Sequence, residues 1–292
     1  MSLSAPLVLA ILFAAVLHAG WNALIKSGGN KSWDTALIHS MGLVFAIPAA
    51  LYFGLPDAAA WPYIAASSAV HVAYYIALAG AYRYGDLGLT YPIMRGSAPM
   101  LVAVVGAGVF GEHLSGQAWA GVLTLSVGVL LVGLARVGVD APDAAGRAQR
   151  RKAITFALAN AAIIASYTVI DGLGVRASGN PFAYSAAIFM IDGLPYMALV
   201  LWRAGPQRRE ALVYMRSRAK LAIGGTAASL GSYSIALWAM THAPVAVVAA
   251  LRETSVIFAA LIGTFLLNEK FGWARAVGTV MVVAGVVGLR FS

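Results

Sequence analysis

Two arginines, Arg95 and Arg252, lie deep inside apolar segments of the sequence. Each stands about seven residues inside its segment, roughly 10 Å along a helix that rises 1.5 Å per residue. A charge at that depth in a bilayer costs about 3 kcal/mol or more, unless it faces a cavity or an opposite charge. One or both could bind a substrate carboxylate. Alternatively, they join helices through ion pairs, for example Arg252 with Glu253 or Asp171.

Aromatic side chains crowd the same apolar segments. They are Trp21, Tyr74, Tyr75, Tyr82, Tyr91, Tyr167, Tyr233 and Trp238. A wall of aromatic faces favours flat apolar ligands by stacking and burial, although Trp and Tyr also anchor helices at membrane interfaces. The residues expected to bind substrate are Trp21, Asn22, Tyr75, Tyr82, Tyr91, Arg95, Tyr167, Trp238, Arg252 and Glu253.

Ionisable groups within the apolar segments could also move protons. His18, His71 and Asp171 form the candidate relay, because imidazole titrates near neutrality; a helix-to-helix hydrogen bond is the alternative for each histidine. Asp171 and Asp192, in "VIDGLG" and "MIDGLP", could instead pair as the carboxylates of an intramembrane aspartyl protease. Their order differs from the known protease motif, so no enzyme is expected.

Motifs for other chemistry are missing from the sequence. It contains no GxxxxGK[ST] loop, no HExxH and no GxSxG, and it has 0 cysteines. We therefore expect no cofactor, no metal site and no disulfide.

The elements that would carry these residues are membrane helices. The 292 residues are 61% hydrophobic and 11% charged, with a mean hydropathy of +0.81, whereas soluble chains carry about 25% charged residues. Apolar runs fall near 5–25, 34–54, 62–82, 88–110, 117–137, 152–175, 181–202, 217–240, 245–267 and 273–290. Each approaches the length that crosses about 30 Å of hydrocarbon. The sequence predicts an all-α polytopic protein of ten transmembrane helices.

The basic residues predict the orientation of these helices. Of the 20 Lys and Arg residues, 16 lie in alternate loops or at the helix ends beside them, and only Arg176 and Arg290 lie on the opposite side. The positive-inside rule then places both termini outside the cytoplasm of a bacterial inner membrane. The net charge of +9 is explained by topology rather than by nucleic acid. The lipid bilayer and a small-molecule substrate are the expected partners, with no obligatory protein partner.

The sequence repeats itself at a spacing of 157 residues. Arg95 falls on Arg252, Glu112 on Glu269, Gly121 on Gly278 and Gly128 on Gly285, without a gap. A weaker match, at a different spacing, sets "AGWNALI" (19–25) against "ASYTVID" (165–171), and so pairs Trp21 with Tyr167 and Asn22 with Thr168.

The repeat divides the chain into two halves of five helices, 1–137 and 152–292, joined by a cytoplasmic linker at 138–151. Because five is an odd number, the halves enter the bilayer from opposite sides. Such an inverted repeat is typical of secondary transporters that work by alternating access.

Two segments carry a resemblance to a known family. "YPIMRGSAPMLVAVVGAGVFGEHLSGQAWAGVLTLSVGVLLVG" and "VVAALRETSVIFAALIGTFLLNEKFGWARAVGTVMVVAGVVG" resemble the two EamA repeats of the drug/metabolite transporter superfamily, including the Gly111-Glu112 and Asn268-Glu269 turns. Within it, the chain looks most like the YddG-type exporters of aromatic and other large neutral amino acids. The resemblance implies amino acid export around a central cavity. Export of another small metabolite or a drug is the alternative. The second segment lacks a counterpart of Pro99.

Overall fold

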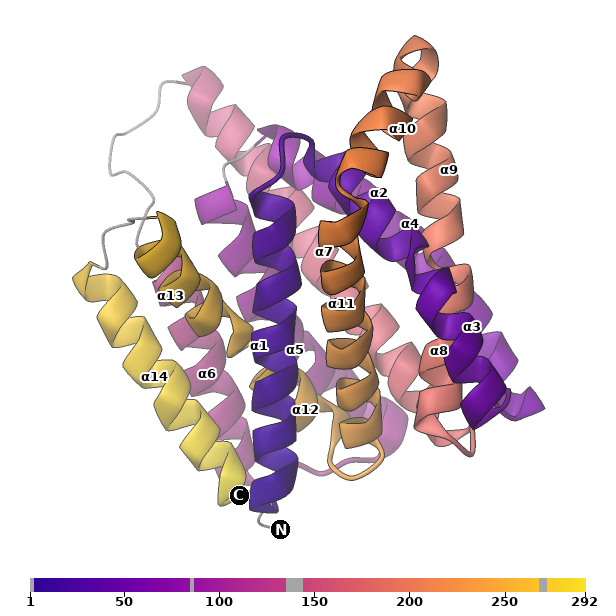
Figure 1. The fold of residues 1–292 in the computed structure, drawn as a ribbon. Coiled ribbons are helices and arrows are strands. Elements are labelled where there is room, and N and C mark those ends of the chain that lie inside the picture. The colour runs from indigo at the N-terminus through magenta and orange to yellow at the C-terminus, as the bar shows by residue number, and fades with distance from the viewer. Residues whose placement is uncertain (1–2, 85–86, 135–143, 268–271) are drawn as a thin grey trace.

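The computed structural model describes residues 3–84, 87–134, 144–267 and 272–292, and these residues form helices and turns with no strand among them (Figure 1). The elements before residue 137 are α1 (Ala5–Lys26), α2 (Lys31–Ser40), α3 (Gly42–Phe53), η1 (Ala58–Ala60), α4 (Trp61–Tyr84), α5 (Leu87–Phe110) and α6 (Gly116–Leu134). Those that follow are α7 (Ala144–Arg176), α8 (Pro181–Ile191), α9 (Gly193–Ala204), η2 (Gly205–Gln207), α10 (Arg208–Ser217), α11 (Ala219–Met240), α12 (Val245–Arg252), α13 (Ser255–Leu267) and α14 (Trp273–Arg290).

The helices make this a multi-pass membrane protein. Seven helical stretches in the described part of the chain are long and apolar enough to cross a bilayer: Ala5–Ile25, Lys31–Phe53, Leu89–Phe110, Gly146–Arg176, Pro181–Ser217, Val245–Ile262 and Trp273–Arg290. The apolar stretch Gly116–Val132 in α6 is shorter. The less apolar helices α4 and α11, of 24 and 22 residues, lie in the same bundle.

Three runs expected as single helices are each divided in two. The breaks fall at Met41 between α2 and α3, at Asp192 between α8 and α9, and at 253–254 between α12 and α13. In contrast, α5 continues through Pro92 and Pro99. Proline therefore does not mark the interruptions. The most consequential break places Arg252 at the end of α12 and Glu253 directly after it.

The turns that follow α1 and α7 have the same construction. Asn30 caps α2 by accepting a hydrogen bond from the Trp33 amide (3.2 Å), and Asn180 caps α8 by accepting one from the Phe182 amide (3.0 Å). These caps lie 150 residues apart, one helical turn away from the spacing of the weak sequence match. Counted from these caps, Trp21 corresponds in position to Asp171, four residues after its partner in the weak sequence match.

Glycines allow α6 and α14 to pack backbone against backbone. A Cβ atom on Gly128 would lie 2.8 Å from the carbonyl oxygen of Gly278, and one on Gly285 would lie 2.9 Å from that of Gly121. Such approaches exclude any larger residue, and they are a common means of helix association in lipid. The other long packed pairs include α4 with α7, α1 with α11, α3 with α8 and α5 with α7.

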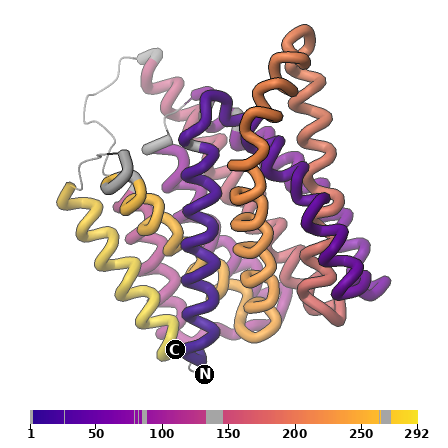
Figure 2. Tube along the Cα trace, in the orientation of Figure 1, coloured from indigo at the N-terminus to yellow at the C-terminus, as the bar shows by residue number. Residues whose placement is uncertain are grey.

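The bundle has two ends, which Figures 1 and 2 show at the bottom and the top. At the bottom, the Leu3 amide donates to the Arg290 carbonyl (3.0 Å), and we call this end the termini face. The top carries the end of α1, the start of α7 and all of α10, and we call it the basic face.

Two features of the basic face differ from expectation. Helix α10, in a loop of the predicted topology, forms an amphipathic hairpin with α9. Residues 144–151 were expected in the linker, but they form the first two turns of the 33-residue α7.

Candidate functional site

An ion pair joins the two halves of the chain near the middle of the bundle. Arg95 on α5 places its Nε atom 2.7 Å from Oε2 of Glu253, which follows the last residue of α12. The two side chains are 9% and 6% exposed. The sequence suggested Glu253 as an ion-pair partner of Arg252, but Glu253 pairs with Arg95 instead.

Arg252 lies against an aromatic ring. Its guanidinium carbon is 5.3 Å from the centroid of Tyr233 on α11, a cation–π distance. The Tyr233 hydroxyl donates a hydrogen bond to Asp171 on α7, and Tyr184 on α8 donates a second at 2.9 Å. Asp171 is fully buried. Arg252 and Asp171 are thus linked through the ring and hydroxyl of Tyr233.

A small void lies between these groups. Its volume is about 10 Å³, which accommodates roughly one water molecule. The void is lined by Arg95, Ala98, Pro99, Val102, Ile164, Tyr167, Thr168, Ala249, Arg252 and Glu253. It therefore gathers four of the expected substrate-binding residues: both arginines, Tyr167 and Glu253.

Aromatic rings extend from this void toward α1 and α2. His71 stacks on Tyr167 with ring centroids 4.4 Å apart, and Tyr74 meets both Tyr167 and Tyr75 edge to face. From Tyr75 the contacts continue through His39 and Trp21 to His18, at centroid distances of 5.8, 5.6 and 5.1 Å. We call His18, Trp21, His39, His71, Tyr74, Tyr75 and Tyr167 the aromatic track. It contains Trp21, Tyr75 and Tyr167 of the expected site.

Tyr196 was not identified from the sequence. Its ring stacks on Tyr75 at 4.2 Å, with 26° between the ring planes. It lies one helical turn after Asp192, on the far side of the α8–α9 break. The four-residue spacing between Asp192 and Tyr196 could have pointed to Tyr196, because residues four apart share a helix face.

The candidate relay residues do not gather in one place. The Nδ1 atom of His71 lies 3.8 Å from Asp192 Oδ1 and 3.0 Å from the carbonyl oxygen of Ser67. Asp171 is occupied by its two tyrosines. His18 contacts Trp21 at the other end of the aromatic track.

The remaining expected site residues are more scattered. Asn22 donates its side-chain amide to the His18 carbonyl within α1 (2.8 Å). Tyr91, one turn before Arg95, packs against both large core clusters. Trp238 contacts His242 near the end of α11, and no ring contact among the described residues links it to the aromatic track. The side chain of Tyr82 lies outside the described part of the chain.

A second polar cluster holds the termini face. Arg176 at the end of α7 donates from Nη2 to Glu112 Oε1 (2.6 Å), and its Nε donates to the Met240 carbonyl (3.1 Å). The other carboxylate oxygen of Glu112 accepts from the amide of Val245, the first residue of α12 (3.0 Å). Glu112, which lies between α5 and α6, therefore caps the helix that ends in Arg252.

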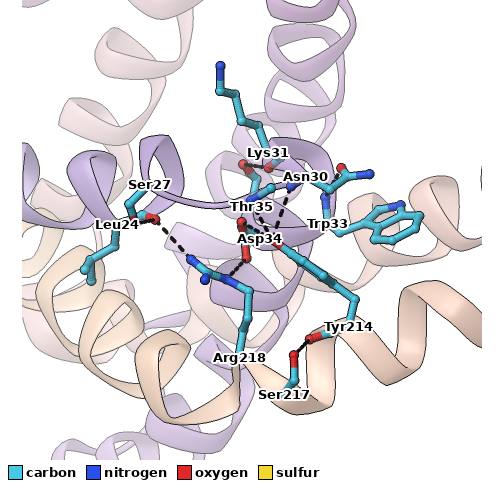
Figure 3. Close-up of polar contacts among 11 residues, drawn as sticks. Leu24, Ser27, Asn30, Lys31, Trp33, Asp34, Thr35, Tyr214, Ser217 and Arg218 are labelled. Carbon is cyan, nitrogen blue, oxygen red and sulfur yellow. Dashed lines mark hydrogen bonds and ion pairs between the residues drawn. The ribbon is translucent and has the colours of Figure 1, made fainter.

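A third cluster holds the basic face (Figure 3). Asp34 on α2 accepts from Arg218 Nε (2.6 Å) and from the Tyr214 hydroxyl (2.9 Å). That hydroxyl also accepts from the amides of Gly29 and Asn30, at 3.0 and 3.1 Å. The cluster fastens the turn between α1 and α2 to α10 and the start of α11.

Known proteins share this fold and part of this sequence. Residues 151–291 match the EamA-like transporter family. Among solved structures, 29 chains match this one. One of these, titled only "Crystal structure of protein", aligns with a TM-score of 0.74 at 19% identity over 98% of this chain and 96% of that chain. A search of curated proteins found no match. The apolar helices make this a multi-pass membrane protein, and the match of residues 151–291 to the EamA-like transporter family supports the drug/metabolite transporter superfamily.

Proposed function

We propose that this chain is a secondary transporter that exports aromatic and other large neutral amino acids across the bacterial inner membrane by alternating access. The family indicates a membrane transporter of small metabolites rather than an enzyme. The chemistry of the central site supports an amino acid as the substrate.

One observation carries the proposal: two buried arginines and one buried carboxylate meet the aromatic track between helices of both halves. Arg95, Arg252 and Glu253 supply partners for a carboxylate and an ammonium group. Tyr167 lines the same void and begins the wall of rings, which suits a flat apolar side chain. An amino acid carries all three of these features.

Helix packing supports alternating access by two inverted halves. Under the 157-residue repeat, exchanging the halves turns the Gly128–Gly278 approach into the Gly285–Gly121 approach, and both approaches are present. In the same way, the packing of α4 with α7 corresponds to that of α11 with α1, and α3 with α8 corresponds to α9 with α2. A pseudo-two-fold relation of this kind lets two halves exchange conformations around a central site.

Counterflow into proteoliposomes tests the substrate. Vesicles loaded with unlabelled amino acid should accumulate labelled Phe, Trp and Met, with Thr as a smaller comparison substrate. Arg252→Ala and Trp21→Ala should each reduce accumulation at least about tenfold, because they remove a charged partner and a ring of the binding surface. Trp202→Ala is a matched control, since Trp202 is 69% exposed on α9.

The results separate this proposal from the alternative. Accumulation of none of the four amino acids by folded wild-type protein would favour another metabolite or a drug as substrate. Normal transport by both Arg252→Ala and Trp21→Ala would show that the site lies elsewhere.

The proposed orientation has both chain ends outside the cytoplasm, with the basic face inside. It rests on the excess of Lys and Arg in the loops of that face. A C-terminal phosphatase fusion should be active and a C-terminal fluorescent protein fusion dark. The reverse pattern would overturn the orientation.

A further inference from the structure

The Arg95–Glu253 pair leaves hydrogen-bonding capacity unused. Arg95 is 8% exposed, and its buried Nε and Nη2 atoms both lack a hydrogen-bond partner among the described residues, as does Glu253 Oε2. The 2.7 Å contact between Nε and Oε2 is therefore an ion pair without hydrogen-bond geometry. Buried donors are nearly always satisfied in folded proteins, and an unsatisfied charged group is costly. An ion pair that served only to hold helices together would gain from satisfying these donors. The free Nη2 instead belongs to a residue that lines the central void.

The charges around the void are balanced. Glu253 compensates Arg95 directly, and Asp171 accepts a hydrogen bond from Tyr233, on whose ring Arg252 lies. The third carboxylate nearby, Asp192, has His71 as its own neighbour at 3.8 Å. The lining residues and Asp171 therefore contribute two positive and two negative charges. A ligand with a net charge would unbalance a site that excludes most water.

We propose that Arg95 and Glu253 pair with each other when no substrate is bound. A zwitterionic substrate breaks this ion pair by binding both side chains at the same time. The substrate carboxylate replaces Glu253 on Arg95, where Nη2 offers an additional donor, and lies beside Arg252. The substrate ammonium replaces Arg95 on Glu253. When the zwitterion leaves, the pair re-forms, so neither buried charge is left alone in the empty carrier. This inference rests on the proposed function and specifies how its site selects ligands.

The consequence is selectivity for molecules that carry both charges. A carboxylic acid without the ammonium group would occupy Arg95 and leave Glu253 unpaired. An amine without the carboxylate would leave Arg95 unpaired. Breaking a buried ion pair by removing one partner costs far more than the net contribution of the pair.

Inhibition of phenylalanine counterflow by two analogues tests this selectivity. 3-Phenylpropionate lacks the ammonium group, and phenethylamine lacks the carboxylate. Each should inhibit the wild-type protein about 100-fold more weakly than unlabelled phenylalanine, because one buried charge stays unpaired. Inhibition by either analogue within about threefold of phenylalanine would overturn the inference while leaving amino acid transport intact. A wild-type protein that transports no amino acid would instead overturn the proposed function.

Two variants should invert the selectivity. In Glu253→Gln the site gains a net positive charge, and 3-phenylpropionate should stabilise the detergent-solubilised protein against heat more than phenylalanine does. In Arg95→Gln the preference should move to phenethylamine. Glu210→Gln, at an exposed carboxylate on α10, is the matched control and should keep the wild-type order. A purely structural role for the pair predicts weaker binding of every ligand without a change in their order.

The double variant Arg95→Glu with Glu253→Arg exchanges the two charges and keeps an ion pair. It provides a folded protein for the test if the single variants misfold. It should retain the preference for zwitterions over both analogues. Loss of that preference in a folded double variant would contradict the exchange of partners.

Discussion

The polar clusters at the two ends of the bundle both join the two halves of the chain, but their ion pairs differ in exposure to solvent. Each fastens a segment before residue 137 to one after residue 152. At the basic face, Asp34 and Arg218 have side chains that are 3% and 21% exposed, whereas Glu112 and Arg176 at the termini face are 15% and 35% exposed. The basic-face cluster is therefore better shielded from water, and its hydrogen bonds contribute more to stability.

The clusters also differ in what they touch. Asp34 is held by the side chains of Arg218 and Tyr214 (Figure 3). Glu112 accepts from the first amide of α12, whose last residue is Arg252. A rigid helix of eight residues transmits a displacement at one end to the other. The comparison indicates that the termini-face cluster is connected through α12 to Arg252, whereas the basic-face cluster is connected through α2 to His39 of the aromatic track.

The largest effect should come from Asp34→Ala. The substitution leaves the largely buried Arg218 guanidinium without its counter-charge, and we expect a loss of about 3 kcal/mol in the free energy of unfolding. Denaturant titration of the detergent-solubilised protein measures it. Glu210→Ala removes an exposed carboxylate from the adjoining helix and should change stability by less than about 0.5 kcal/mol. An effect of Asp34→Ala no larger than that of Glu210→Ala would show that the basic-face cluster does not stabilise the fold.

Glu112→Ala should be less destabilising but should affect the site. It removes the acceptor of the Val245 amide, a loss comparable to that of a helix cap, so we expect about 1–2 kcal/mol. The affinity for phenylalanine, measured as stabilisation of the protein against heat, should weaken several-fold in this variant and stay near wild type in Asp34→Ala. Unchanged binding in Glu112→Ala would show that α12 does not connect the two places.

A smaller effect is expected from Tyr214→Phe. The hydroxyl donates to Asp34 and accepts from the amides of Gly29 and Asn30, so its loss should cost about 1 kcal/mol. Hydrogen exchange at these two amides should become faster while the ring keeps its contact with Trp33. Unchanged exchange would mean that the hydroxyl does not hold the turn.

Features governed by composition and helix packing were predictable from sequence. Lipid requires helices, and small residues are needed wherever two of them touch closely, as at Gly128 and Gly278. The depth of Arg95 and Arg252 likewise identified residues that line the central void. Glycine at a close helix contact and arginine deep in an apolar segment each have one dominant physical explanation, so the residue type alone predicts its surroundings.

Partners and helix breaks were not predictable in the same way. Arg95 rather than Arg252 pairs with Glu253, because the chain breaks directly after α12, where no proline or glycine signals an interruption. Tyr196 meets Tyr75 from α9, which begins after the interruption at Asp192. Pairings across the bundle depend on the direction of whole helices, which local spacing does not determine.

The smallest effect separates the clusters by their response to salt. Screening shortens the range of exposed charge interactions from about 10 Å at 0.1 M salt to about 3 Å at 1 M. Glu112→Gln keeps an oxygen for the Val245 amide but loses the charge opposite Arg176, which is 35% exposed, so its cost should be about 0.5 kcal/mol at the lower salt and vanish at the higher. Asp34→Asn should remain destabilising at both concentrations, because the carboxylate that it removes is only 3% exposed. If the effect of Asp34→Asn also disappeared in salt, the basic-face cluster would be as open to solvent as the other.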